Sequence, residues 1–135
     1  MSQFRSKRNK YDITFSKFVL LRDKVCQWCL KREAKECSHI FSRSNMGTRC
    51  DPRNAFGACN YCHRKWHSEP LLAAEWCQSV MGEQEYYKLL RLAKTPSKMS
   101  VFDKDYIRKE QQGVIKQIES GETVPVPWAK MWKTK

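Results

Sequence analysis

The sequence lacks any apolar run long enough to cross a lipid bilayer, which takes about 20 residues. Its first residues, MSQFRSKRNKYD, are basic but contain neither the apolar segment nor the small-residue cleavage site of a signal peptide. Internal repeats and a glycine-rich loop of the kind that cradles phosphate are also missing. These absences argue against a membrane-spanning protein, and we expect the protein to stay in a cytoplasm.

Acidic residues are scarce. Only 14 Asp and Glu stand against 26 Lys and Arg, which gives the 135 residues a formal net charge of +12. The excess is greatest in residues 1–35, with ten basic and three acidic side chains. So much charge of one sign opposes compaction unless a polyanion binds it, and nucleic acid is therefore the expected partner. The alternative is that the lysines only keep the protein in solution.

The cysteines are odd in number, seven in all, which argues against a simple disulfide framework. Four of them form two C-x2-C pairs, Cys26 with Cys29 and Cys59 with Cys62, and two such pairs can supply four thiolates to a tetrahedral zinc ion. A redox C-x-x-C is the alternative, but it would need a βαβ context that is not evident. We expect Cys77 to be a buried helix residue. Cys37 or Cys50 could replace a member of the four.

All three histidines, His39, His63 and His67, lie between residues 37 and 67. His63 and His67 are four residues apart, so on a helix they share a face and can bind one ion. Cys62 and His63 are adjacent and point about 100° apart on a helix. Cys62 can therefore face the zinc while His63 faces a second metal. The alternative for a histidine is an ordinary core or surface side chain.

The pattern of apolar and helix-breaking residues predicts one small α+β domain of about 135 residues. We expect four parts: a flexible basic arm (1–10), a zinc-stapled core (11–70), a helical extension packed on the core (71–121) and a flexible basic tail (122–135). In the tail, Trp128 and Trp132 are expected to be available for docking. Trp28, Trp66 and Trp76 are expected in the core.

Within the core we expect a helix capped by Asp12 and ending near Asp23, with Ile13 on its apolar face. Short strands are expected over 37–41 and 54–58, with a loop over 42–53 between them. A helix should open at Cys59 and stop before Pro70. In the extension, helices are expected over residues 71–81, 83–94 and 103–121.

His39, Asn54, His63 and His67 follow one another at intervals of 15, 9 and 4 residues. This spacing resembles the motif of HNH, or ββα-metal, endonucleases, and the flanking cysteine pairs resemble the zinc-bearing branch of that family. The resemblance covers roughly residues 25–70. The wider layout is similar to phage recombination nucleases of the NinG or Rap type and, more distantly, to endonuclease VII.

The resemblance implies a metal-dependent DNA endonuclease, acting in a bacterial or phage-infected host and possibly on branched DNA. His39 would be the general base and Asn54 would orient its imidazole, while His63 and His67 would hold a catalytic Mg²⁺, Mn²⁺ or another divalent ion. The expected products are a 5′-phosphate and a 3′-hydroxyl. Zinc would be structural, and a palindromic or four-way DNA substrate would favour a homodimer.

One position departs from the family pattern. Many members carry Asp or His as a metal ligand immediately before the base, whereas this chain has Ser38, and a hydroxyl is a poor ligand beside a carboxylate. Three readings are open: water completes the coordination shell, another acid such as Asp51 reaches the ion, or the ion is held weakly.

Five cations lie close in sequence to the motif and can clamp backbone phosphates: Arg43, Arg49, Arg53, Arg64 and Lys65. Alternatively, they form a solvated loop face. A second class of function also remains open: a non-catalytic zinc module that binds nucleic acid and uses its histidines structurally. His39 separates the two, because a binding module needs no imidazole there.

Overall fold

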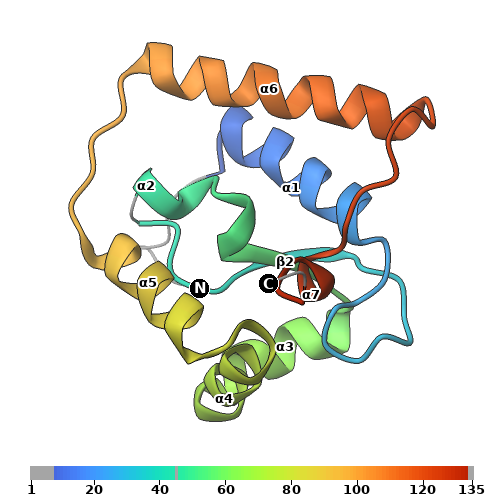
Figure 1. The fold of residues 1–135 in the computed structure, drawn as a ribbon, viewed down its shortest axis with the longest axis vertical. Coiled ribbons are helices and arrows are strands. Elements are labelled where there is room, and N and C mark those ends of the chain that lie inside the picture. The colour runs from blue at the N-terminus through green and yellow to red at the C-terminus, as the bar shows by residue number, and fades with distance from the viewer. Residues whose placement is uncertain (1–7, 45, 134–135) are drawn as a thin grey trace.

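The computed structural model describes residues 8–44 and 46–133, Met46 by its backbone alone. It is a small α+β protein in which helices surround one two-stranded sheet (Figure 1). The elements in chain order are α1 (Lys10–Asp23), β1 (Glu36–His39), α2 (Met46–Arg49), the 3₁₀ turn η1 (Pro52–Asn54), β2 (Ala55–Ala58), α3 (Asn60–Ser68), α4 (Pro70–Met81), α5 (Glu83–Lys94), α6 (Val101–Glu119) and α7 (Trp128–Met131).

The sheet consists of β1 and β2, antiparallel, with His39 opposite Ala55 and Ser38 opposite Phe56. In Figure 1, α1 and α6 lie side by side above it, and α3 and α4 lie below it. Because side chains alternate along a strand, His39 points toward α1 and Ser38 toward α3. The contacts agree: His39 lies against Phe15 of α1, and Ser38 lies against His63 of α3.

Helix α1 begins earlier than the sequence predicts. Asn9 is its N-cap, accepting from the backbone N–H groups of Tyr11 and Asp12, and Asp12 accepts in return from the Asn9 N–H as the second half of a capping box. Residues 8–10 are therefore ordered at a helix start rather than part of a flexible arm, while residues 1–7 lie outside the described part. Ile13 is 58% exposed and does not belong to the core.

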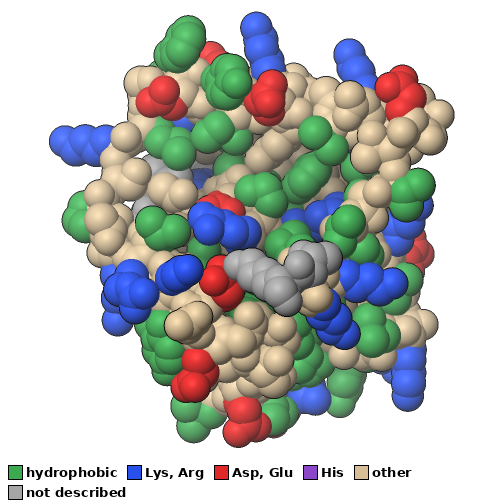
Figure 2. Space-filling view, viewed as in Figure 1, with side chains coloured by type: hydrophobic (Ala, Val, Ile, Leu, Met, Phe, Trp, Pro, Cys, Tyr) green, Lys and Arg blue, Asp and Glu red, His purple; other side chains and the backbone are tan. Residues whose placement is uncertain are grey.

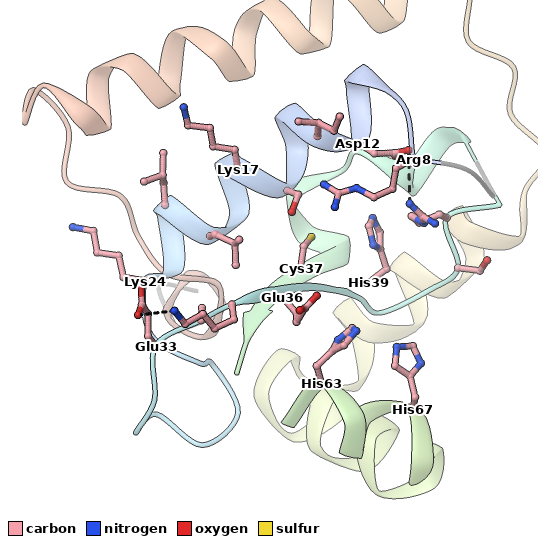
Figure 3. A pocket seen from close by; sticks show the side chains of 18 of the residues that line it. Arg8, Asp12, Lys17, Lys24, Glu33, Glu36, Cys37, His39, His63 and His67 are labelled. Carbon is pink, nitrogen blue, oxygen red and sulfur yellow. Dashed lines mark ion pairs between the residues drawn. The ribbon is translucent and has the colours of Figure 1, made fainter. Parts of the chain in front are cut away.

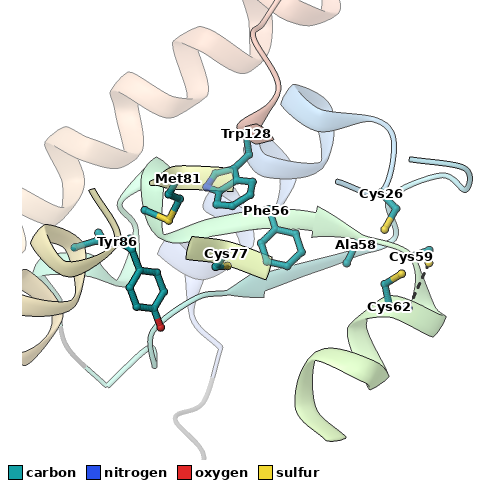
Figure 4. Packing of buried hydrophobic residues seen from close by; sticks show 10 residues of the cluster. Cys26, Phe56, Ala58, Cys59, Cys62, Cys77, Met81, Tyr86 and Trp128 are labelled. Carbon is teal, nitrogen blue, oxygen red and sulfur yellow. Dashed lines mark hydrogen bonds between the residues drawn. The ribbon is translucent and has the colours of Figure 1, made fainter. Parts of the chain in front are cut away.

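The larger core cluster lies on the α3 side of the sheet (Figure 4). The Phe56 ring of β2 packs edge-on against Trp76 with ring centroids 5.1 Å apart, and tilted against Trp128 at 5.3 Å. Trp28, Trp66 and Trp76 pack against this cluster, as predicted. A smaller cluster of Phe15, Val19 and Ala55 holds α1 on the other face.

The C-terminal segment is not a flexible tail where the structure describes it. Trp128 is fully buried, its backbone N–H donates to Asp23 at 2.9 Å, and its indole N–H donates to the Arg53 carbonyl at 3.0 Å. The neighbouring Ala129 N–H donates to the Gln27 side chain. A large aromatic ring that fills the core outweighs the preference of a Pro-rich, basic sequence for open chain.

Asp23, at the end of α1, joins three parts of the fold. It accepts two hydrogen bonds from the Arg22 guanidinium, one from the Gly57 N–H at 2.7 Å and one from the Trp128 N–H. Position 57 must be glycine, because a Cβ there would lie 2.8 Å from the Cβ of Ala34. The buried carboxylate is thereby fully paired, as a charge at such depth requires.

The helical extension follows the sequence prediction closely. Helix α5 has the predicted bounds, α4 begins one residue earlier than predicted, and α6 begins at Val101, where Ser100 and Asp103 form a capping box. On the face shown in Figure 2, Lys and Arg side chains spread around the outline and no histidine is visible. Among the described residues, no helix combines the length and the apolar character needed to span a membrane.

Candidate functional site

Cys26, Cys59 and Cys62 lie at one end of the larger core cluster (Figure 4), and Cys29 packs against it. The sulfur atoms of Cys26, Cys29, Cys59 and Cys62 all lie within 4.8 Å of one another. A tetrahedral zinc ion with Zn–S bonds of about 2.3 Å needs sulfurs about 3.8 Å apart, so small side-chain adjustments bring all four into range. The cluster is compatible with structural zinc.

Each pair sits on a tight turn of the backbone. In the first, the Leu30 N–H donates to the Cys26 carbonyl and Leu30 adopts a positive φ of 58°. In the second, Cys59 is the N-cap of α3, and its sulfur accepts from the Cys62 N–H at 3.4 Å. Such turns aim both sulfurs of a pair at one point, which is the arrangement of a zinc knuckle.

Hydrogen-bond donors around the sulfurs favour thiolates. Burial alone would raise the pKa of Cys29, but the backbone N–H groups of Lys31 and Arg32 and neighbouring thiols outweigh it and bring the pKa to about 6. For Cys59, burial also raises the pKa, and donors including the Cys62 N–H lower it below its ordinary value. Burial raises the pKa of Cys26 and Cys62 instead, so hydrogen bonding predisposes two of the four sulfurs to the thiolate form that binds a divalent cation.

The remaining cysteines stand apart from this cluster. Cys77 is fully buried on α4, as predicted, and burial raises its pKa. Cys37 and Cys50 pack against the smaller core cluster, where burial raises their pKa values to about 12 and 11. Neither replaces a member of the four, and both are protonated thiols at neutral pH.

His39 is held by a backbone carbonyl. Its Nε2 lies 2.8 Å from the Arg49 oxygen, and since a carbonyl only accepts, Nε2 carries the proton and Nδ1 has a free lone pair in the neutral ring. Burial lowers the pKa of His39 below its ordinary value, so the ring is neutral at pH 7. A neutral imidazole of fixed tautomer can accept a proton at Nδ1.

The Arg49 segment is itself fixed by a carboxylate of α1. The Arg49 guanidinium donates to both oxygens of Asp12, at 2.8 and 2.6 Å, and the two side chains are buried. Burial would raise the pKa of Asp12, but hydrogen bonds from Arg49 and the Asn9 N–H outweigh it and hold the pKa below its usual range. Asp12 therefore positions the carbonyl that orients His39. The sequence analysis treated Asp12 only as a helix cap.

The hydrogen bonds of the Asn54 side chain go to the backbone and not to the His39 ring, which the resemblance implies it would orient. Its amide accepts from the Phe41 N–H and donates to the carbonyls of Phe41 and Thr48, and it is fully buried. Asn54 thus ties together the two ends of the connection between β1 and β2. Its effect on His39 is indirect, because Thr48 directly precedes Arg49.

Ser38 and His63 lie within hydrogen-bond distance, with Oγ 2.6 Å from Nδ1. Ser38 is buried, whereas His63 is half-buried and His67 exposed. The His63 and His67 rings stand edge-on with centroids 4.7 Å apart on one face of α3. When Nδ1 of His63 donates to Ser38, its Nε2 has the lone pair that a metal ligand needs.

All three histidines line one hollow of about 1360 Å³. Figure 3 shows β1 crossing it, with His39 on the α1 side of the strand and His63 and His67 on the α3 side. The histidines do not form a preassembled metal site. Within residues 8–44 and 46–133, the four cysteines are the only group of three or more potential ligands gathered closely enough for one ion.

The five cations predicted to contact phosphate have different environments. Arg43 lines the hollow 3.7 Å from Asp12, while Arg49 is buried in its pair with Asp12 and has no surface to offer a phosphate. Arg53 pairs with Asp51, so Asp51 is engaged there and does not line the hollow.

On α3, Arg64 is exposed, and the Lys65 ammonium lies 4.8 Å from the centroid of the Trp28 ring. Arg8, just before α1, also lines the hollow; the sequence analysis assigned it only to the basic arm.

No family model, curated protein or solved structure matches the chain. The likeness to HNH nucleases therefore rests on the motif residues alone.

Proposed function

We propose that this protein is a metal-dependent DNA endonuclease of the HNH type, built on a ββα-metal arrangement of β1, β2 and α3. The observation that carries the proposal is that His39, His63 and His67 line one hollow from two sides of a single strand. A phosphodiester lying over β1 would have a proton acceptor on one side and two imidazole ligands on the other.

His39 is suited to the role of general base. Its Nδ1 takes a proton from a water molecule as the water oxygen attacks phosphorus; the bond between phosphorus and the 3′ oxygen breaks, and that oxygen takes a proton from solvent. The products are a 5′-phosphate and a 3′-hydroxyl. The Arg49 carbonyl stabilises the resulting imidazolium, because it continues to accept the Nε2 proton.

The donor set of α3 favours a transition-metal ion. Two imidazoles suit Ni²⁺ or Zn²⁺ better than Mg²⁺, which prefers oxygen ligands, although the carboxylate of Glu36 also lines the hollow. An ion bound by His63 and His67 would act as a Lewis acid on the phosphoryl oxygen and stabilise charge on the leaving oxygen.

The alternative function is a zinc module that binds nucleic acid without cleaving it. The buried hydrogen bonds of Ser38 and of His39 favour it to some degree, since they also stabilise the fold. The two functions differ in what they require of Nδ1 on His39.

Nicking of supercoiled plasmid separates the two functions. Zinc-loaded protein is assayed with Mg²⁺, Mn²⁺ or Ni²⁺ as wild type, as His39→Ala, as the more conservative His39→Gln, and as Lys109→Ala on the exposed side of α6. We expect cleavage by wild type and Lys109→Ala, and a loss of at least 100-fold in both His39 variants with zinc content retained. Absence of nicking by the wild type, or wild-type rates in both His39 variants, would contradict the nuclease proposal and favour the binding module.

A further inference from the structure

The hollow extends well beyond the three histidines. One wall is a face of α1, and the other is the extended segment that leads into β1 (Figure 3). Its volume of about 1360 Å³ exceeds the 300 to 1,000 Å³ typical of small-molecule pockets, which points to a polymeric occupant.

The α1 wall is a single helical face. Residues that line the hollow recur along it at helical spacing: Asp12, Ile13, Ser16, Lys17, Leu20, Leu21 and Lys24. From Asp12 to Lys24 the helix rises about 18 Å, at 1.5 Å per residue. At about 3.4 Å per phosphate along one strand of a stacked helix, that length holds at most about five nucleotides.

The lining carries complementary charge for a polyanion. Five cations, Arg8, Lys17, Lys24, Lys35 and Arg43, face three acids. Two of the acids are compensated: Asp12 is held by Arg49, and Glu33 lies 3.3 Å from Lys35. Lys17 pairs with Glu119 at 3.5 Å and Lys35 with Glu33 at 3.3 Å, but both lysine side chains are more than half exposed, and a phosphate can displace such weak surface pairs.

Aliphatic side chains alternate with the cations on the same wall. Ile13 is 58% exposed, and Leu20 and Leu21 are half-buried. The outside of a duplex presents phosphate and sugar, whereas an unpaired strand also presents the apolar faces of its bases. A hollow with two walls, mixing lysine and aliphatic groups, is therefore suited to one strand, while a duplex would contact only its rim.

We infer that the groove between α1 and residues 33–39 binds up to about five nucleotides of unpaired DNA beside the scissile bond. The inference rests on the proposed nuclease function only in placing the scissile bond next to the histidines. Binding of the strand in the groove does not depend on cleavage. The substrate class is thus DNA with a single-stranded segment next to the cut, such as a flap, overhang or branch.

Fluorescence anisotropy tests the groove without any cleavage. The probes are a fluorescein-labelled 12-nucleotide single strand and the matching 12-base-pair duplex, titrated with zinc-loaded full-length protein in buffer without added Mg²⁺, Mn²⁺ or Ni²⁺. We expect the single strand to bind at least tenfold more tightly than the duplex. Equal or tighter binding of the duplex would overturn the inference.

Matched variants locate the binding surface. The pair Ile13→Glu with Lys17→Glu changes the charge of the groove by −3, and the pair Val101→Glu with Lys109→Glu makes the same change at exposed positions of α6 outside the groove. We expect the first pair to weaken single-strand binding at least tenfold and the second no more than about twofold. Equal losses in both pairs would mean that net charge alone drives binding and would overturn the inference.

A single, milder substitution keeps the test valid if the double variant misfolds. Lys17→Gln removes one phosphate contact at an exposed position, so the salt dependence of single-strand binding should fall by about 0.7 in log–log slope. An unchanged slope would count against the groove. Failure of the nuclease proposal would look different, since His39→Ala would then leave plasmid nicking unaffected whatever the anisotropy result.

Discussion

Ser38 Oγ lies 2.6 Å from Nδ1 of His63, at the position where the resemblance leads one to expect a metal-ligating side chain. The hydroxyl therefore orients the His63 ring, which is the ligand in the proposed function, instead of serving as a ligand itself. Of the three readings left open by the sequence, the one that relies on Asp51 is disfavoured, because Asp51 pairs with Arg53.

Two different substitutions of Ser38 should change the affinity for a metal ion in opposite directions. Ser38→Ala removes the hydrogen bond that fixes the His63 ring, and we expect about a tenfold loss in Ni²⁺ affinity, a usual cost of deleting such a supporting contact. Ser38→Asp should add a carboxylate ligand and raise affinity. Isothermal titration with Ni²⁺ on zinc-loaded protein measures both, with Ser79→Ala on exposed α4 as the control. Equal affinities in all four proteins would refute the assignment of His63 as a ligand.

Asp12→Asn should destabilise the protein and disturb His39 together. The Arg49 guanidinium would remain buried without its counter-charge, and we expect a loss of about 2 to 4 kcal/mol in the free energy of unfolding, measured by urea denaturation. Asp105→Asn, which alters a surface pair with Lys10, should cost less than about 1 kcal/mol. A similar loss in the two variants would contradict the buried clamp.

The lowered pKa of His39 predicts a pH dependence of stability. In the unfolded chain an ordinary histidine takes up a proton near pH 6.5, whereas the folded protein resists protonation to a lower pH, so the stability from His39 is present above pH 6.5 and is lost as pH falls toward its folded pKa. His39→Gln removes this contribution and retains the other two histidines. The drop in urea midpoint between pH 7.5 and 5.5 should therefore be smaller in the variant; a drop of equal size would show that His39 titrates normally.

Removal of zinc should loosen the end of the core that contains the cysteine cluster. Cys59→Ser breaks the cluster and weakens the N-cap of α3, so we expect loss of zinc and a fall in Tm on the order of 10 °C. Cys77→Ala is the control, because Cys77 is buried apart from the cluster and should leave zinc near one per chain by elemental analysis. Full zinc content in Cys59→Ser would exclude this residue as a ligand.

Local spacing in the sequence was enough to predict the cysteine cluster and most helices. A C-x2-C pair brings its own sulfurs together on one turn, so only the meeting of the two pairs depended on the fold. Helix α5 and the start of α3 followed from periodicity and from proline and glycine positions. The sequence predicts a loop where the structure has the short helix α2 and the turn η1. These elements contain four and three residues, which is too few for a periodic pattern of apolar residues, and the segment is rich in turn-forming residues.

Contacts between distant parts of the chain could not be predicted in this way. The Asp12–Arg49 pair joins residues 37 apart, and the Trp128–Asp23 hydrogen bond joins residues 105 apart. Neither leaves a trace in local propensity, and the proline-rich surroundings of Trp128 suggested an open chain. The size of its side chain was the one available sign, since tryptophan is highly buried on average.

The buried position of Trp128 also affects when the protein can fold during its synthesis. The ring completes a cluster whose other members come from residues 26 to 89, and its backbone is anchored on a carboxylate that left the ribosome more than a hundred residues earlier. A nascent chain that lacks Trp128 cannot close this core, so consolidation must wait until this residue has left the ribosome, and products truncated before it should be targets for proteolysis.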